Sequence, residues 1–233
     1  MLLDKYNRKI DYLRVSVTDR CNLRCVYCMP ACGIIHKPHQ DLLSFEEIAE
    51  IVKAAVCLGI DKVRITGGEP LVRKDLSSLI SLLNNIEGIK DISLTTNAVL
   101  LKEYASALKK AGLKRINISL DSLDPARYKC LSRGGSLEEV LAGISRSLEV
   151  GFTPLKINVL LLEGITEKEI LDFLRLSLEN PLCVRFLEFM PVNSFYKINN
   201  FISCGEVMDI AKRFAEIEET LVLGNGPARI YKF

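Results

Sequence analysis

Short stretches of alternating apolar and polar residues recur along the chain, and longer amphipathic stretches separate them. Strict alternation predicts strands, because successive side chains of a strand point to opposite faces. Apolar residues three and four positions apart predict helices. The expected strands are 13–17, 62–66, 92–95, 115–120, 155–161 and 183–189, with a further strand-like stretch at 221–233.

Helix signals lie between these strands. Ser44 and Thr166 each precede a Glu by three positions, which is the spacing of a capping box. Ser203 opens a last helix, and Gly112 and Gly151 end two others. The expected helices begin near residue 44, cover about 76–83, 102–111, 136–150 and 166–178, and begin again near 203.

Strand and helix alternate six times, which predicts a parallel sheet with right-handed crossovers. Six units are too few for a closed eight-stranded barrel. We therefore expect an α/β fold, a partial (β/α)6 TIM-like barrel with parallel strands and a polar lumen, in which residues 1–233 form one domain.

The expectation of a polar lumen rests on the alternation within the strands, which gives each strand one apolar and one polar face. The apolar face has to meet the helices, so the polar face lines the inside. Burying so many unpaired polar groups would cost about 1–3 kcal/mol each, which favours a wet cavity for a polar ligand. This face carries Arg14, Ser16, Arg64, Thr66, Ser93, Thr95, Asn97, Arg115, Asn117, Ser119, Asp121, Lys156, Asn158 and Arg185.

Basic residues on several of these strands indicate an anionic ligand, with phosphates or carboxylates. We expect Arg14, Arg64 and Lys156 to face the cavity. Arg115 begins its strand, far from the carboxyl ends at which active sites of such folds gather, and we expect it to face solvent.

Cys21, Cys25 and Cys28 follow the first expected strand with the spacing C-x3-C-x2-C. Thiolates select iron–sulfur clusters, zinc or copper(I). Three thiolates can hold three corners of a 4Fe–4S cluster and leave one iron open to a chelating ligand. The alternative is a structural zinc site with Cys32 as fourth ligand, although such sites usually join two ligand pairs from separate stretches.

Gly67-Gly-Glu-Pro70 ends the second strand, at the edge where active sites of such folds gather. Paired glycines allow close approach of the backbone to a ligand, and Glu69 offers a carboxylate to an amine. His36 and His39 belong to no motif, and we expect them at the solvated surface. Cys57 and Cys183 lie in apolar patterns, which predicts buried packing.

The composition excludes several classes of protein. The 233 residues include 48% hydrophobic and 26% charged residues, an ordinary globular balance. The net charge of +2 and the absence of Trp argue against a nucleic-acid-binding platform. Charges precede any apolar run at the start, and no stretch approaches the length of a membrane span. We expect a cytoplasmic protein without membrane or nucleic-acid partners, in which clustered cysteines bind metal.

The order of these motifs resembles the radical S-adenosylmethionine (SAM) enzymes, and most closely the molybdenum cofactor biosynthesis protein A family, the GTP 3′,8-cyclases. The resemblance covers nearly the whole chain. The stretches that carry it are Leu13–Asn22, Tyr27–Pro30, Arg64–Leu71, Leu94–Asn97, Arg115–Asp121, Lys156–Asn158, Arg185–Met190 and Gly224–Arg229.

The resemblance implies one 4Fe–4S cluster held by Cys21, Cys25 and Cys28, with SAM on the open iron. A 5′-deoxyadenosyl radical would then take the ribose 3′ hydrogen of GTP, and the substrate radical would attack guanine C8. The implied SAM contacts are Tyr27, Gly68, Ser119 and Met190. The implied GTP contacts are Arg14, Arg64, Thr95 and Lys156, with Arg185 a weaker candidate. A low-potential electron donor of the flavodoxin or ferredoxin type is also implied, and a homodimer is compatible with the resemblance.

The sequence departs from this family in two respects. The family carries a second cluster-binding three-cysteine stretch beyond the point corresponding to Phe233, and this chain has no second triad. Ala98 stands where a glycine is usual. We therefore expect a truncated homologue that binds the first cluster and SAM without completing cyclisation alone. The alternatives are a radical enzyme for a peptide or another nucleotide, and a non-catalytic metal-binding module.

Overall fold

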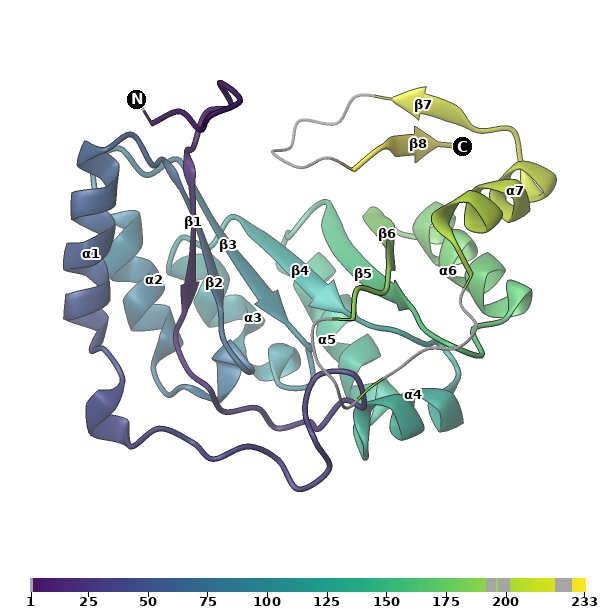
Figure 1. The fold of residues 1–233 in the computed structure, drawn as a ribbon, viewed down its shortest axis with the longest axis horizontal. Helices are drawn as coiled ribbons and strands as arrows, with labels where there is room; N and C mark the ends of the chain where they lie inside the picture. Colours follow the sequence, from purple (N-terminus) through teal and green to yellow (C-terminus); the bar gives the residue numbers. More distant parts are fainter. Residues whose placement is uncertain (1, 192–195, 197–201, 221–227) are drawn as a thin grey trace.

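A computed structural model of the protein describes residues 2–191, 196, 202–220 and 228–233. Six parallel strands form one sheet in sequence order, as expected (Figure 1). Consecutive strands are neighbours throughout, and β1 and β6 are the two edges of an open sheet. The strands are β1 (Tyr12–Ser16), β2 (Lys62–Thr66), β3 (Asp91–Thr96), β4 (Arg115–Ser119), β5 (Leu155–Leu161) and β6 (Leu182–Glu188).

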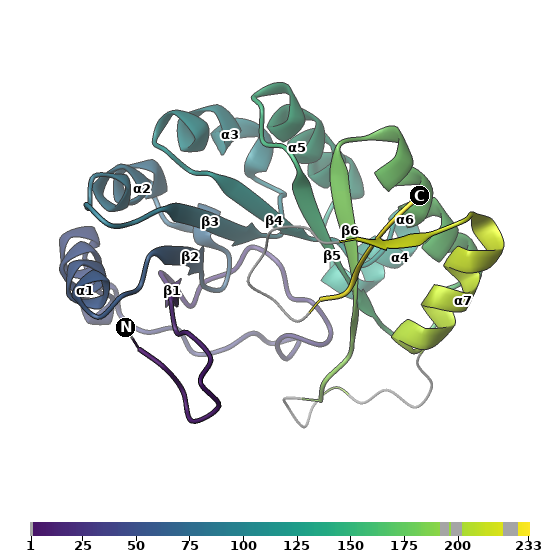
Figure 2. The same ribbon diagram turned by 90° about the horizontal axis from the view of Figure 1, so that it is seen from above.

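Helices cover the convex outer face of the curved sheet (Figure 2). The two capping boxes predicted at Ser44 and Thr166 are confirmed, and Ser203, predicted to open the last helix, forms a third; each N-cap side chain and its Glu exchange hydrogen bonds with the backbone. The helices that follow the strands along the chain are α1 (Phe45–Cys57), α2 (Leu76–Asn84), α3 (Leu101–Lys110), α5 (Leu137–Glu149), α6 (Glu167–Glu179) and α7 (Cys204–Phe214).

The two faces of the sheet differ as the alternation predicts. Val63, Ile65, Ile116, Ile118 and Ile157 are fully buried in the core that joins strands to helices. The polar side chains between them face the lumen in register. Arg14 pairs with Arg64 and Arg64 with Ser93, while Thr95 pairs with Asn117 and Asn117 with Lys156.

Some elements were not expected. Helix α4 (Pro125–Ser132) follows β4 directly, with Asp124 as its N-cap. Two single-turn helices, η1 (His39–Asp41) and η2 (Pro70–Val72), lie in loops after β1 and β2. A small antiparallel pair joins β7 (Glu218–Thr220) to β8 (Ile230–Lys232), and β8 is the strand found among the described residues of the stretch expected at 221–233. Residues 221–227, and most of the long connection after residue 191, lie outside the described residues.

Candidate active site

The cysteine-bearing loop after β1, residues 17–33, crosses the carboxyl edge of the sheet (Figure 1). Backbone hydrogen bonds fix its first part to the end of β2. The N–H of Gly68 donates to Thr18 O at 2.7 Å, and the N–H of Glu69 donates to Arg20 O at 2.7 Å. Two residues just before the first cysteine, Cys21, are therefore held by the segment that follows β2.

The paired glycines are required by this contact. A Cβ atom on Gly67 would lie 2.6 Å from Thr18 O, and one on Gly68 would lie 2.2 Å from Arg20 O. Both distances are shorter than any real Cβ contact, and both neighbours are backbone atoms. The backbone that the two glycines approach is the cysteine loop, and Gly68 itself is exposed.

Glu69 does not offer its carboxylate to an amine, which corrects the expectation from the sequence. Its side chain is buried and accepts three hydrogen bonds: from the Leu71 N–H at 3.0 Å, the Thr96 hydroxyl at 2.7 Å and the Asn97 N–H at 2.7 Å. Burial raises the pKa of Glu69, and the hydrogen bonds oppose this shift. The carboxylate connects the end of β2 to the end of β3.

Asn97 carries this connection on to the cysteine loop. Its side-chain amide Nδ2 donates to Asn22 Oδ1 at 2.8 Å and lies 3.9 Å from Cys21 Sγ. The next residue, Ala98, is fully buried with φ of +64°, a conformation that favours glycine. The position at which the sequence departs from its family is thus a left-handed turn directly after Asn97.

The three thiols lie near one another in an environment that disfavours thiolates. Burial raises the pKa of all three thiols. The pKa of Cys25 rises to about 12. Burial is the largest cause, and repulsion from Asp121, Cys28 and Cys21 raises the pKa further. Metal ligation requires thiolates, and the charge of a metal centre would offset these effects. The site therefore fits a bound metal cluster.

The grouping of the thiols gives no support to the zinc alternative. Across the described residues, no three His, Cys, Asp or Glu side chains are placed to hold one metal ion. Thiolates of a 4Fe–4S cluster bind separate iron atoms and need not converge on one point. Cys32 is exposed and lies beyond the triad.

Tyr27 joins the cysteine loop to the far side of the lumen. Its hydroxyl donates to Asp121 Oδ2 at 2.5 Å, and Asp121 Oδ1 accepts the Leu160 N–H at 2.9 Å. Burial raises the pKa of Asp121, while the bonds from Tyr27 and Leu160 lower it. Asp121 follows β4 two residues after Ser119, so the expected SAM contacts Tyr27 and Ser119 belong to adjoining parts of one site.

The lumen contains buried polar atoms without hydrogen-bond partners among the described residues. They include Tyr12 Oη, Asn158 Oδ1 and Arg185 Nε. Burial lowers the pKa values of three basic side chains, Arg64, Lys156 and Arg185. Repulsion from neighbouring cations lowers each of these pKa values further. An anion with hydrogen-bonding groups would satisfy these atoms and offset the repulsion, so the lumen fits a phosphorylated ligand.

The other expected site residues are distributed around this lumen. Thr95 and Ser119 are half-buried on the polar face. Arg14 is exposed, because it lies on the edge strand of an open barrel. Met190, two residues beyond β6, is 74% exposed, so only its sequence position supports a role in binding.

Arg115 differs from its expected position in solvent. It is half-buried and forms a two-pronged ion pair with Asp91, through Nε at 2.9 Å and through Nη2. Cys57 was expected in the core but is exposed, while Cys183 is half-buried. His39 is exposed, as expected, and contacts Arg20, whereas His36 is half-buried and lies 3.6 Å from Asp19.

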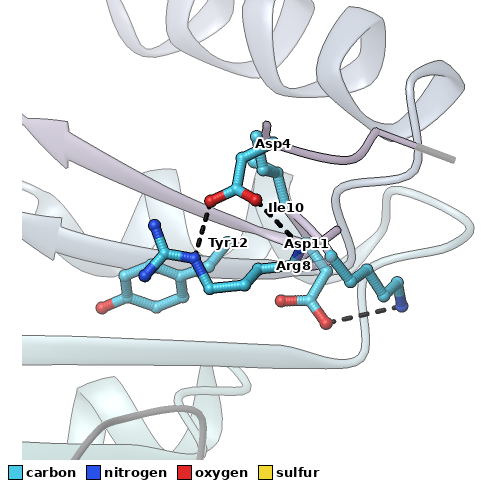
Figure 3. A pocket seen from close by; sticks show the side chains of 6 residues that line it. Asp4, Arg8, Ile10, Asp11 and Tyr12 are labelled. Carbon is cyan, nitrogen blue, oxygen red and sulfur yellow. Dashed lines mark hydrogen bonds and ion pairs between the residues drawn. The ribbon is translucent and has the colours of Figure 1, made fainter. Parts of the chain in front are cut away.

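A cavity of about 470 Å³ at the opposite, amino end of β1 is formed largely by paired charges (Figure 3). Arg8 donates to Asp4 at 2.6 Å, and Lys9 lies 3.4 Å from Asp11. Because its positive and negative charges are paired, this cavity lacks the excess of basic residues that distinguishes the lumen.

Comparison with known proteins agrees with this site. The Radical SAM superfamily profile matches residues 15–177. A GTP 3′,8-cyclase of Alkaliphilus oremlandii is 50% identical over 98% of this chain and 71% of its own length. The GTP 3′,8-cyclases of Alkaliphilus metalliredigens and Peptoclostridium acidaminophilum are 51% and 48% identical, over 71% and 72% of their lengths. The chain belongs to the GTP 3′,8-cyclase family within the radical SAM superfamily.

Solved structures confirm the fold. Streptococcus suis SuiB bound to SAM has a TM-score of 0.71 at 21% identity, covering 88% of this chain and 46% of that one. HydG from Carboxydothermus hydrogenoformans has a TM-score of 0.63 at 19% identity, covering 86% and 50%. Enzymes of this superfamily use a 4Fe–4S cluster and SAM, and the triad for the cluster is present here.

Proposed function

We propose that this chain acts in molybdenum cofactor biosynthesis as a GTP 3′,8-cyclase. The observation that carries the proposal is a basic lumen with unpaired polar atoms, on the inner face of the sheet whose carboxyl edge the cysteine loop crosses. Relatives about half identical in sequence are GTP 3′,8-cyclases, and their substrate carries the anionic groups that such a lumen would bind.

The basic residues bind and orient GTP in this proposal. Arg64 and Lys156 stand on β2 and β5, on either side of Thr95, and together they hold the triphosphate by charge-assisted hydrogen bonds. Arg14 contributes from the open edge. Arg185 already donates through Nη2 to Asn117 Oδ1 at 2.8 Å, which leaves its Nε for the ligand.

The cysteine loop and the strand ends position the cofactors. Cys21, Cys25 and Cys28 hold the cluster, and Gly68, Ser119, Tyr27 and Met190 contact SAM. When bound, the cluster and SAM would supply the one-electron chemistry that removes a hydrogen atom from the substrate ribose. The chain holds one C–H bond close and excludes other hydrogen donors, which is positioning rather than acid–base chemistry.

Further assignments stay predictions. We expect a low-potential one-electron donor of the flavodoxin or ferredoxin type and a cytoplasmic location, and a homodimer is compatible with this assignment. In the described part of the chain, no helix is long and apolar enough to cross a membrane. Residues 1–233 act as one radical SAM core in this proposal.

The test begins with the chain reconstituted anaerobically with iron and sulfide, then supplied with reductant and SAM. 5′-Deoxyadenosine and cyclised GTP are quantified with and without GTP. Deoxyadenosine that rises with GTP supports the proposal. Formation indifferent to GTP would indicate a radical enzyme with another substrate, and a zinc-loaded protein without formation would indicate a metal-binding module.

GTP binding gives an independent measurement. Lys156→Gln removes a half-buried lumen cation and should weaken GTP binding about tenfold, the loss of one charge-assisted hydrogen bond. Lys114→Gln is the matched control, because Lys114 is exposed before β4. Equal affinities for the two variants would contradict the lumen as the GTP site.

A further inference from the structure

A second cavity, of about 580 Å³, lies between the cysteine loop, the start of α1 and the segment after η2. We call it the basic pocket. None of its described lining residues belongs to a strand of the large sheet, so it lies apart from the lumen. The lining residues are Thr18, Arg20, His39, Leu42, Ser44, Phe45, Val72, Arg73 and Lys74.

The charges of the basic pocket are all of one kind among the residues described. Its cations are Arg20, Arg73 and Lys74, His39 lies in contact with Arg20, and no described lining residue carries a carboxylate. None of these three cations forms an ion pair with a carboxylate among the described residues. Asp19, the carboxylate next to Arg20 in sequence, accepts the Lys37 N–H at 2.6 Å and is also close to His36.

Arg73 shows that this positive charge is fixed. Its guanidinium donates to Val17 O at 2.7 Å and to Leu43 O at 2.6 Å, and it lies over the Phe45 ring at 4.3 Å. These partners are neutral. The bonds hold the cation in place without neutralising it, which favours an anionic partner in the basic pocket.

The position of the basic pocket relative to the cysteines indicates which partner. Arg20 precedes Cys21 directly, so their Cα atoms are about 3.8 Å apart. The Arg20 carbonyl is held by Glu69, which fixes this wall to the cysteine loop. A partner bound here reaches the cluster ligands from outside the lumen, and the lumen stays free for substrate.

We propose that the basic pocket docks an acidic one-electron carrier protein, whose carboxylates contact Arg20, Arg73 and Lys74. The proposal rests on the proposed function, because that reaction requires one electron at the cluster. The carrier is oxidised by one electron and the cluster is reduced by one, with no bond made or broken. Leu42, Phe45 and Val72 supply the apolar contacts that protein interfaces combine with Arg.

The experiment measures binding of a flavodoxin to the reconstituted chain by calorimetry, at low and high salt. Lys74→Glu reverses an exposed charge of the basic pocket and should weaken binding at least about tenfold, with a smaller salt dependence. Lys114→Glu makes the same charge change elsewhere and should change affinity less than about twofold. Equal affinities for the two variants would overturn the proposal.

Reduction kinetics separate this proposal from the proposed function. With flavodoxin as donor, cluster reduction in Lys74→Glu should slow about tenfold, whereas reduction by dithionite should not change. This selective loss supports docking even if GTP cyclisation is never observed. Equal slowing with both reductants overturns docking. Inorganic phosphate binding that Lys74→Glu abolishes, with flavodoxin binding intact, overturns it in favour of a small anion.

Discussion

The hydroxyl of Tyr27 lies 2.5 Å from Asp121 Oδ2, although the two residues are 94 positions apart along the chain. Through the second oxygen of Asp121, the same carboxylate also holds the backbone of β5 at Leu160. One buried carboxylate thus sets the position of the cysteine loop relative to the ends of two central strands.

Removing the Tyr27 hydroxyl should destabilise the chain. Tyr27→Phe leaves Asp121 Oδ2 without this donor in a buried site, which costs about 1–3 kcal/mol. Urea unfolding of the metal-free chain measures this loss, separately from any effect on the cluster.

A double-mutant cycle with Asp121→Asn isolates the contact. We expect the two substitutions to be non-additive by about 0.5–3 kcal/mol. Strict additivity would show that Tyr27 and Asp121 contribute independently.

Adding a methyl group at Gly68 should displace the cysteine loop. Gly68→Ala places Cβ 2.2 Å from a backbone oxygen, and relief of this overlap should cost about 1–3 kcal/mol. Iron bound after reconstitution and the urea midpoint should both fall.

Gly205→Ala is the matched control for that substitution. Its Cβ would lie 3.6 Å from Oγ of Ser203, the N-cap of α7, which is an ordinary contact. Alanine favours the helix, so we expect a gain of about 0.5–1 kcal/mol. A similar loss in both variants would refute the close approach at Gly68.

The pH dependence of stability should reveal the buried Glu69. Burial raises its folded-state pKa above the ordinary value of 4.5. Between the unfolded and folded values, the folded state binds more protons than the unfolded state, so stability falls as pH rises. The stabilisation that the raised pKa of Glu69 gives to the folded state is fully present below pH 4.5. It is lost as the pH rises through the folded-state pKa.

Glu69→Gln removes this titration. Urea unfolding of both proteins at a series of pH values from 4.5 upward should show a flatter profile for the variant. The altered hydrogen bonding of Gln lowers the free energy of unfolding by the same amount at every pH. It therefore leaves the slope of stability against pH unchanged. Parallel profiles would mean that Glu69 is ionised in the folded state as readily as in the unfolded chain.

Arg115 should matter for stability more than for GTP binding. Arg115→Gln leaves the half-buried Asp91 without its two-pronged partner, at a cost of about 1–3 kcal/mol. GTP affinity should change less than about threefold, in contrast to Lys156→Gln. A tenfold loss of GTP affinity would place Arg115 among the ligand-binding cations.

Short-range sequence signals predicted most elements, and their failures have physical causes. Helix α4 was missed because it has eight residues and a weak apolar pattern, although Asp124 before Pro125 is a helix-start signal. Cys57 is exposed because it ends α1, where the buried stripe of the helix has already turned away.

The sequence by itself determined the strand–helix order, the polar lumen face and the cysteine triad, because each depends on spacing along a few residues. Only the tertiary structure decided the partners of Glu69, Asp121 and Arg115. Their oxygen and nitrogen atoms meet groups from other strands, and which strand supplies the partner depends on how the sheet and the cysteine loop assemble. The same assembly placed Arg20, Arg73 and Lys74 around one pocket beside Cys21.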